Sequence, residues 1–126
     1  MPPTHPVTHP DAKAIRKAAL GYPETVEDFP WGDVAFKVRG KKAFCFFGSY
    51  EDGGFGVTLK LPFRAADALA HPFAEPTGYG LGSSGWVTCR FGPKEKAPRA
   101  LLLDWLDESW RAVAPKSLSK TVTFEP

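Results

Sequence analysis

Large apolar residues alternate with small or polar ones in three stretches of the chain, as they do in half-buried β-strands. The three stretches are residues 34–39, 56–61 and 86–91. In the first of them, Lys37 and Arg39 alternate with Phe36 and Val38, which are predicted to be buried. A glycine after Arg39 turns the chain into the apolar residues 43–47, which predicts a β-hairpin.

Apolar residues recur at helical spacing in two longer stretches. In the first, Ala12, Ile15 and Ala19 share one face, and Gly21 and Pro23 end the helix. The second helix is predicted from about residue 98 to residue 113. Its predicted buried face consists of Leu102, Trp105, Leu106, Ser109 and Val113, and its predicted solvated residues are Asp104, Asp107, Glu108 and Arg111.

The remaining segments complete a single-domain prediction. Residues 64–69 predict a short helix, and residues 73–85 are dense in Gly, Pro and Ser, which predicts a long loop. Residues 1–10 predict a flexible N-terminal arm, followed by one domain over residues 11–126. Sequential hairpins with helices at both ends predict an α+β fold, in which a single antiparallel β-sheet carries its helices on one face and leaves the other face open.

Composition limits the classes of function without choosing one. The chain has 126 residues, enough for one buried core, and a net charge of only +2. Binding to nucleic acid would therefore require the cations to gather on one face. Cys45 and Cys89 lie in apolar runs and are expected to be buried thiols. Because no apolar run approaches the length of a membrane span and the N-terminus lacks a signal sequence, we expect a cytoplasmic protein.

Motifs that would indicate catalysis or a cofactor lack their required context. Residues 80–85 fit the dinucleotide pattern G-x-G-x-x-G, but a strand is predicted after them where a helix would hold the pyrophosphate. His71 is predicted at a helix end, too isolated to activate Ser83 or Ser84. His5 and His9, in the arm, lack a third metal ligand. We therefore expect no catalytic residue, no metal site and no cofactor.

Basic residues are predicted to share the open face of the sheet with an aromatic residue. Period-two alternation places Lys37, Arg39, Lys60, Trp86 and Arg90 there, and the hairpin turn adds Lys41 and Lys42 at its edge. A positive surface that carries an aromatic ring can hold phosphates and stack a base. A polar open face that merely keeps the sheet soluble is the alternative interpretation.

Four segments resemble the MmcQ/YjbR family in the expected order. They are residues 29–44, 57–60, 85–87 and 106–116. The resemblance implies a two-layer fold similar to frataxin and to type III secretion chaperones. Family members are described as DNA-binding proteins with a double-wing motif of β-hairpins, which makes residues 39–42 one wing and Trp86 the residue that opens the late strand. Residues 82–85 differ from many members, which have basic or polar residues there.

The sequence therefore predicts a non-enzymatic domain that binds DNA weakly and in a salt-sensitive manner, through about four to six phosphate contacts. The alternative is a protein-interaction or chaperone-like module that binds a protein partner or forms a homodimer. Its predicted exposed apolar patch draws on Phe47, Phe55, Trp86 and Trp110. Iron binding, which the frataxin likeness suggests, is not expected, because the first helix exposes lysine and arginine where carboxylates are needed.

Overall fold

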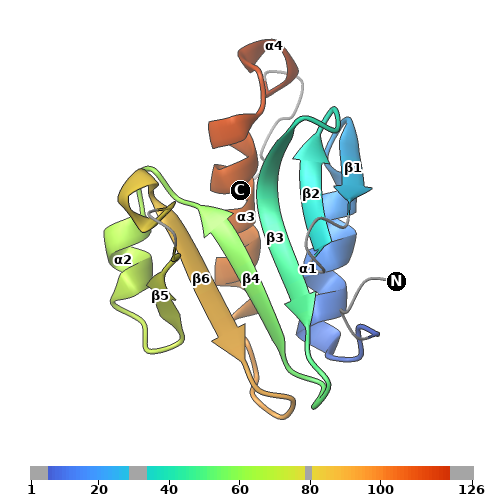
Figure 1. Cartoon of the computed structure of the whole chain (residues 1–126), viewed down its shortest axis with the longest axis vertical. Coiled ribbons are helices and arrows are strands. Elements are labelled where there is room, and N and C mark those ends of the chain that lie inside the picture. The colour runs from blue at the N-terminus through green and yellow to red at the C-terminus, as the bar shows by residue number, and fades with distance from the viewer. Residues whose placement is uncertain (1–5, 29–33, 79–80, 120–126) are drawn as a thin grey trace.

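The computed structural model describes residues 6–28, 34–78 and 81–119. Its strands are β1 (Thr25–Asp28), β2 (Val34–Val38), β3 (Lys42–Ser49), β4 (Phe55–Lys60), β5 (Ala74–Pro76) and β6 (Trp86–Phe91). Its helices are α1 (Pro10–Gly21), α2 (Ala65–Leu69), α3 (Arg99–Val113), α4 (Lys116–Ser119) and the 3-10 helix η2 (Leu81–Ser84). The strands form one sheet in the order β1-β2-β3-β4-β6-β5, and every neighbouring pair is antiparallel (Figure 1).

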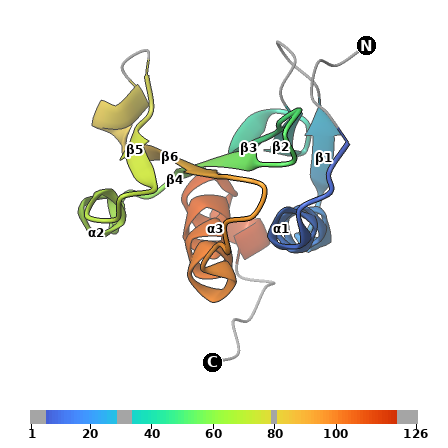
Figure 2. The same cartoon turned by 90° about the horizontal axis from the view of Figure 1, so that it is seen from below.

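Helices α1 and α3 lie side by side on the same face of the sheet, and α2 lies beside the edge formed by β5 and β6 (Figure 2). In the part of the chain that the structure describes, no α-helix covers the opposite face, and the short 3-10 helix η2 lies at its β5–β6 end. The predicted fold class, an α+β fold with one antiparallel sheet and its helices on one face, is confirmed. The open face is the surface on which the predicted binding residues have to be placed.

The core lies between the sheet and the two long helices, as the alternation predicts. Val57, Leu59, Val87 and Cys89 are each 1% exposed, and they face one another across β4 and β6. The residues that alternate with them along these strands, such as Thr58 and Thr88, point to the open face. Hydrophobic burial on one side of each strand therefore fixes which side chains a ligand of the open face would meet.

The buried face of α3 is wider than predicted. Trp110 is fully buried, and Asp107, which we expect in solvent, is 8% exposed. The Asp107 carboxylate accepts hydrogen bonds from the Tyr22 hydroxyl at 2.9 Å and from Arg111 Nε at 2.8 Å. The prediction of a solvated Asp107 is wrong because α3 packs against α1 as well as against the sheet, so two sides of the helix are covered.

His9 departs from the flexible arm expected over residues 1–10, of which residues 1–5 lie outside the described ranges. Its ring is 5% exposed. Nδ1 accepts the backbone N–H of Asp11 at 3.1 Å, and Nε2 donates to the Glu95 carbonyl oxygen at 2.7 Å. His9 thus caps α1 and joins it to the loop before α3, an interaction between residues too far apart in sequence to be predicted.

Both cysteines are free and buried, and they should react slowly with thiol reagents. Burial raises the pKa of Cys45 strongly and the pKa of Cys89 to about 12. At pH 8 only about one Cys89 thiol in ten thousand is then ionised, and the thiolate is the reactive form. We expect labelling by Ellman's reagent to be at least 100-fold slower in the native protein than in urea, and to keep rising above pH 9. Rapid labelling of one equivalent at pH 8 would contradict this.

Candidate functional site

Two adjoining hollows lie at the end of the sheet where the β2–β3 hairpin meets the carboxyl end of α3. One, of about 360 Å³, is lined by Lys42, Ala43, Lys60, Trp86, Ala112 and Val113. The other, of about 460 Å³, is lined by Val38, Arg39, Lys41, Lys42, Val113, Ala114 and Pro115. Lys42 and Val113 line both hollows, which therefore adjoin. We call Lys41, Lys42, Lys60 and Trp86 the hairpin-end site.

The strand register brings Lys42, Lys60 and Trp86 together, and Lys41 precedes Lys42 in the hairpin turn. Trp86, the first residue of β6, lies directly opposite Lys60, the last residue of β4. Lys42 is the first residue of β3, the strand that pairs with β4 on its other side, and it lies opposite Val38 of β2. The start of β3, the end of β4 and the start of β6 therefore lie at the same end of the sheet. As a result Lys42 and Trp86, which are 44 residues apart in sequence, line the same hollow.

The hairpin turn is tight and has backbone strain at one residue. Arg39 and Gly40 have φ values of 55° and 70°, and the Lys41 N–H donates to the Val38 carbonyl at 3.0 Å, which is the pattern of a type I′ turn. Gly40 adopts this conformation freely, whereas Arg39 does so at a cost of about 1 kcal/mol. Its side chain donates twice to the Glu24 carboxylate, at 3.0 and 3.1 Å, and its N–H donates to the Glu24 carbonyl at 2.8 Å. These bonds hold the turn and fix the direction in which Lys41 and Lys42 leave it.

Three of the seven predicted binding residues are paired with carboxylates. Lys37 Nζ lies 2.7 Å from Asp28, Arg39 is held by Glu24, and Arg90 forms an ion pair with Glu75. Asp28 belongs to β1 and Glu75 to β5, two strands that the sequence did not predict. The open face is consequently not the uniformly basic surface that the alternation of Lys37, Arg39, Lys60 and Arg90 suggests.

The other four predicted residues form the hairpin-end site. Among the residues that the structure describes, Lys41, Lys42 and Lys60 have no carboxylate within ion-pair distance. Trp86 is half-buried, and its ring centroid lies 5.5 Å from that of Phe46, at a tilt of 54°. Sequence analysis did not single out Phe46, although it shares the face of Lys37 and Thr58 by register. The site therefore combines three unpaired ammonium groups with an aromatic pair.

The other motifs considered from sequence have structural roles. Residues 81–84 form a single 3-10 turn and β6 begins at Trp86, so the helix that a dinucleotide would need does not follow. The His71 ring stacks on Phe73 and meets Trp105 edge-on, with centroids 4.9 and 5.7 Å away. Within residues 6–28, 34–78 and 81–119, no group of three potential ligands could hold a metal ion. No helix of these ranges is both long and apolar enough to cross a membrane.

The exposed apolar patch expected for a protein-interaction module is not where it was predicted. Phe47, Phe55 and Trp110 are at most 1% exposed, because each faces the core. The most exposed large apolar side chain among the described residues is instead Phe63, at 87%. The only sequence signal for it is its place directly after Pro62, at the end of a strand.

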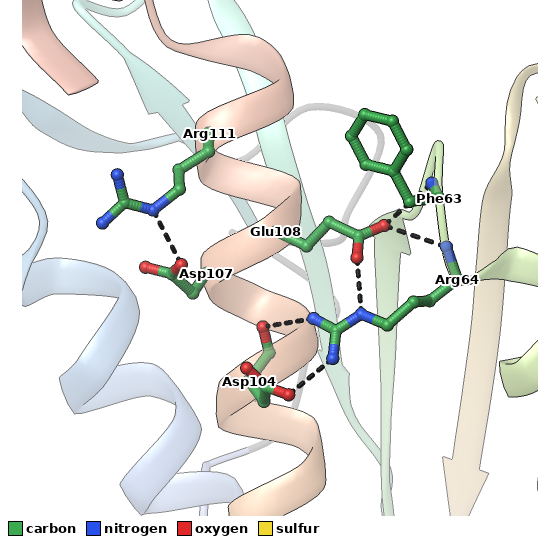
Figure 3. Close-up of polar contacts among 6 residues, drawn as sticks. All are labelled: Phe63, Arg64, Asp104, Asp107, Glu108 and Arg111. Atoms are coloured by element: carbon green, nitrogen blue, oxygen red, sulfur yellow. Dashed lines mark hydrogen bonds and ion pairs between the residues drawn. The ribbon is translucent and has the colours of Figure 1, made fainter. Parts of the chain in front are cut away.

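The turn that carries Phe63 is held by ionic contacts with α3 (Figure 3). Glu108 accepts the backbone N–H groups of Phe63 and Arg64 at 3.1 and 3.2 Å, and it accepts Arg64 Nε at 2.6 Å. Arg64 also pairs with Asp104. The Glu108 side chain is only 10% exposed, so the prediction that it faces water is wrong. Phe63 is thus an exposed ring on a fixed backbone.

Comparison with known proteins identifies relatives over most of the chain. The model of the YjbR family matches residues 20–112, a range that contains the whole hairpin-end site. A similar solved structure is the crystal structure of the Deinococcus radiodurans protein DR2400, which has a DUF419 domain. That chain is 25% identical, the match covers 94% of this chain and 90% of the other, and the TM-score is 0.69. No curated protein matches.

Proposed function

This chain belongs to the YjbR family, and we propose that it binds nucleic acid at the hairpin-end site without catalysing a reaction. The observation that supports the proposal is that two unpaired lysines, Lys42 and Lys60, line one hollow with a half-exposed tryptophan, and a third, Lys41, lines the adjoining hollow. Phosphate oxygens are the natural partners of such ammonium groups, and every nucleobase can stack on an aromatic ring. The surrounding hollows give a backbone room to approach Lys42 from two sides.

The ion pairs on the open face reduce the number of basic residues that are available to bind nucleic acid. Lys37, Arg39 and Arg90 already have carboxylate partners, and Asp28 and Glu75 would repel phosphate that approached them. We therefore assign phosphate contact to Lys41, Lys42 and Lys60 and stacking to Trp86. The number of phosphates contacted falls to about three, fewer than the sequence alone predicts.

The affinity for nucleic acid should fall with rising salt as expected for about three phosphate contacts. For about three contacts to a single strand, log K should change with log salt at a slope of roughly −2, or about twentyfold between 50 and 200 mM. Fluorescence anisotropy with a labelled twelve-nucleotide oligothymidine, repeated at several salt concentrations, measures the slope. Absence of binding to single-stranded and duplex DNA at 20 mM salt would refute the proposed function.

Phe63 supports a second candidate function, the binding of a protein partner or of a second copy of the chain. Its ring is 87% exposed and its backbone N–H is bonded to Glu108, so an apolar side chain is presented to solvent from an ordered turn. The salt titration separates the two candidates, since an interface centred on an apolar ring depends little on ionic strength.

A further inference from the structure

Two glycines face each other on the open face of the sheet, and the Tyr50 side chain lies over one of them. Gly48 of β3 and Gly56 of β4 are opposite each other in the register. Phe46 and Tyr50 stand two residues before and after Gly48, so they are on the same side of the sheet. A hollow of about 270 Å³ occupies this region, with both aromatic residues in its lining. The volume is below the 300–1,000 Å³ of pockets for drug-sized ligands, and it suits one planar ring system.

Tyr50 lies across the sheet because residue 56 is a glycine. A Cβ at that position would collide with the Tyr50 hydroxyl oxygen. Tyr50 is 39% exposed, so one part of the ring packs on the strand and the rest stays available. The phenol thereby closes one end of the hollow, and Phe46 closes the other.

One wall of the hollow is a chain of hydroxyl groups. Thr88 Oγ1 lies 2.9 Å from Thr58 Oγ1 and 3.0 Å from Thr77 Oγ1. Three hydroxyls carry three protons, and the two mutual hydrogen bonds use two of them. One O–H donor and several acceptor lone pairs are left for a ligand. This wall can therefore hydrogen-bond the edge of a heterocycle whose face lies on an aromatic ring.

The hollow adjoins the hairpin-end site through Phe46, which lines the hollow and also contacts the Trp86 ring. We propose that the open face takes a single strand of nucleic acid. The phosphates lie at Lys60 and at the adjoining end of the sheet, where Lys42 lines the same hollow as Lys60 and Trp86. One base lies on Trp86, and a second base lies in the hollow lined by Phe46 and Tyr50. This inference rests on the proposed function, and it adds the form of nucleic acid and the place of the bases.

Geometry and charge both favour a single strand over a duplex. Lys60 and Gly56 are four residues apart on β4, about 13 Å, whereas stacked bases are about 3.4 Å apart. Consecutive bases placed at both positions must therefore be unstacked, because the face that lies on a protein ring cannot also lie on a neighbouring base. The base edge that bonds the threonine hydroxyls must likewise be free of pairing. The carboxylates Asp28 and Glu75 flank the same face and would repel a second phosphate backbone.

Three labelled twelve-mers test the inference at 50 mM salt: oligothymidine, an abasic strand with the same phosphates, and a duplex. We expect oligothymidine to bind at least tenfold more tightly than the abasic strand and more tightly than the duplex. Equal affinity for the thymidine and abasic strands, or tighter binding of the duplex, would overturn the inference while leaving the proposed function intact. Failure of all three to bind would overturn both.

Two variants locate the bases. Phe46→Leu and Tyr50→Leu keep apolar bulk but remove a ring, and each should lower affinity for oligothymidine at least threefold while leaving the abasic strand unaffected. Leu20→Ala, which removes an exposed apolar side chain from α1, is the control and should change neither affinity. Thermal unfolding of each variant shows that the fold is retained. An unchanged oligothymidine affinity in both open-face variants would overturn the assignment of the hollow.

Discussion

Replacing Lys42 and Lys60 together by glutamate should lower the affinity for oligothymidine at least a hundredfold at 50 mM salt. The double variant removes two of the three unpaired cations of the hairpin-end site and puts carboxylates in their places. A loss of about tenfold for each reversal corresponds to about 1.4 kcal/mol. The slope of affinity against salt should also flatten, because fewer counterions are released.

The matched control for this experiment is on the other side of the molecule. Lys13 and Lys17 are exposed on α1, in the helical layer, and reversing both changes the net charge by the same amount. We expect the control to lose less than threefold in affinity, since 50 mM salt largely screens charges that are more than about 14 Å from the phosphates. Equal losses in the two double variants would mean that net charge, and not the hairpin-end site, determines binding.

Alternation and the hairpin turn were sufficient to predict the four central strands of the sheet and their buried side. Val57 and Leu59 are buried and Thr58 is on the open face because the period of two is a local property of extended backbone. The hairpin turn at Arg39 and Gly40 was predictable for a similar reason, since a glycine between two strand patterns marks a turn. The resemblance that led to the family also includes residues 29–33, which lie outside the described ranges.

The two edge strands could not be predicted from their own residues. Strand β1 has Val26 as its single large apolar residue, and Val26 is 47% exposed. This strand forms because it pairs with β2 and because Arg16 of α1 holds Glu27 with two hydrogen bonds, at 2.9 and 3.1 Å. Both interactions are tertiary, and they leave no periodic signal in the sequence.

These missed strands are the reason why the predicted site was too large. Alternation correctly placed Lys37 and Arg90 on the open face, but it gave no information about their neighbours. The edge strands bring Asp28 and Glu75 beside them. The hollows around Lys42 were equally beyond prediction, because they depend on where the carboxyl end of α3 docks. Sequence can thus propose the cations of a site, and packing decides which of them remain unpaired.

Ser109→Ala should lower the free energy of unfolding by about 2–4 kcal/mol. Ser109 is fully buried, and its hydroxyl bridges two backbone groups: it donates to the Phe44 carbonyl and accepts the Lys60 N–H at 2.8 Å. Phe44 is the extra residue of a β-bulge in β3, so it has no partner in either neighbouring strand. The serine hydroxyl takes the place of the missing ladder contact between β3 and β4.

Alanine at position 109 would leave that carbonyl and that N–H buried and unsatisfied, at about 1–3 kcal/mol for each group. Urea unfolding followed by tryptophan fluorescence measures the change, and Ser117→Ala, at an exposed helical serine, is the control expected to change stability by less than about 0.5 kcal/mol. The amide of Lys60 should also exchange with solvent faster in Ser109→Ala, because its acceptor is gone. A loss below 0.5 kcal/mol with an unchanged Lys60 exchange rate would show that the hydroxyl does not hold the two strands together. Since Lys60 belongs to the hairpin-end site, this buried serine connects the stability of the sheet to the position of a proposed phosphate contact.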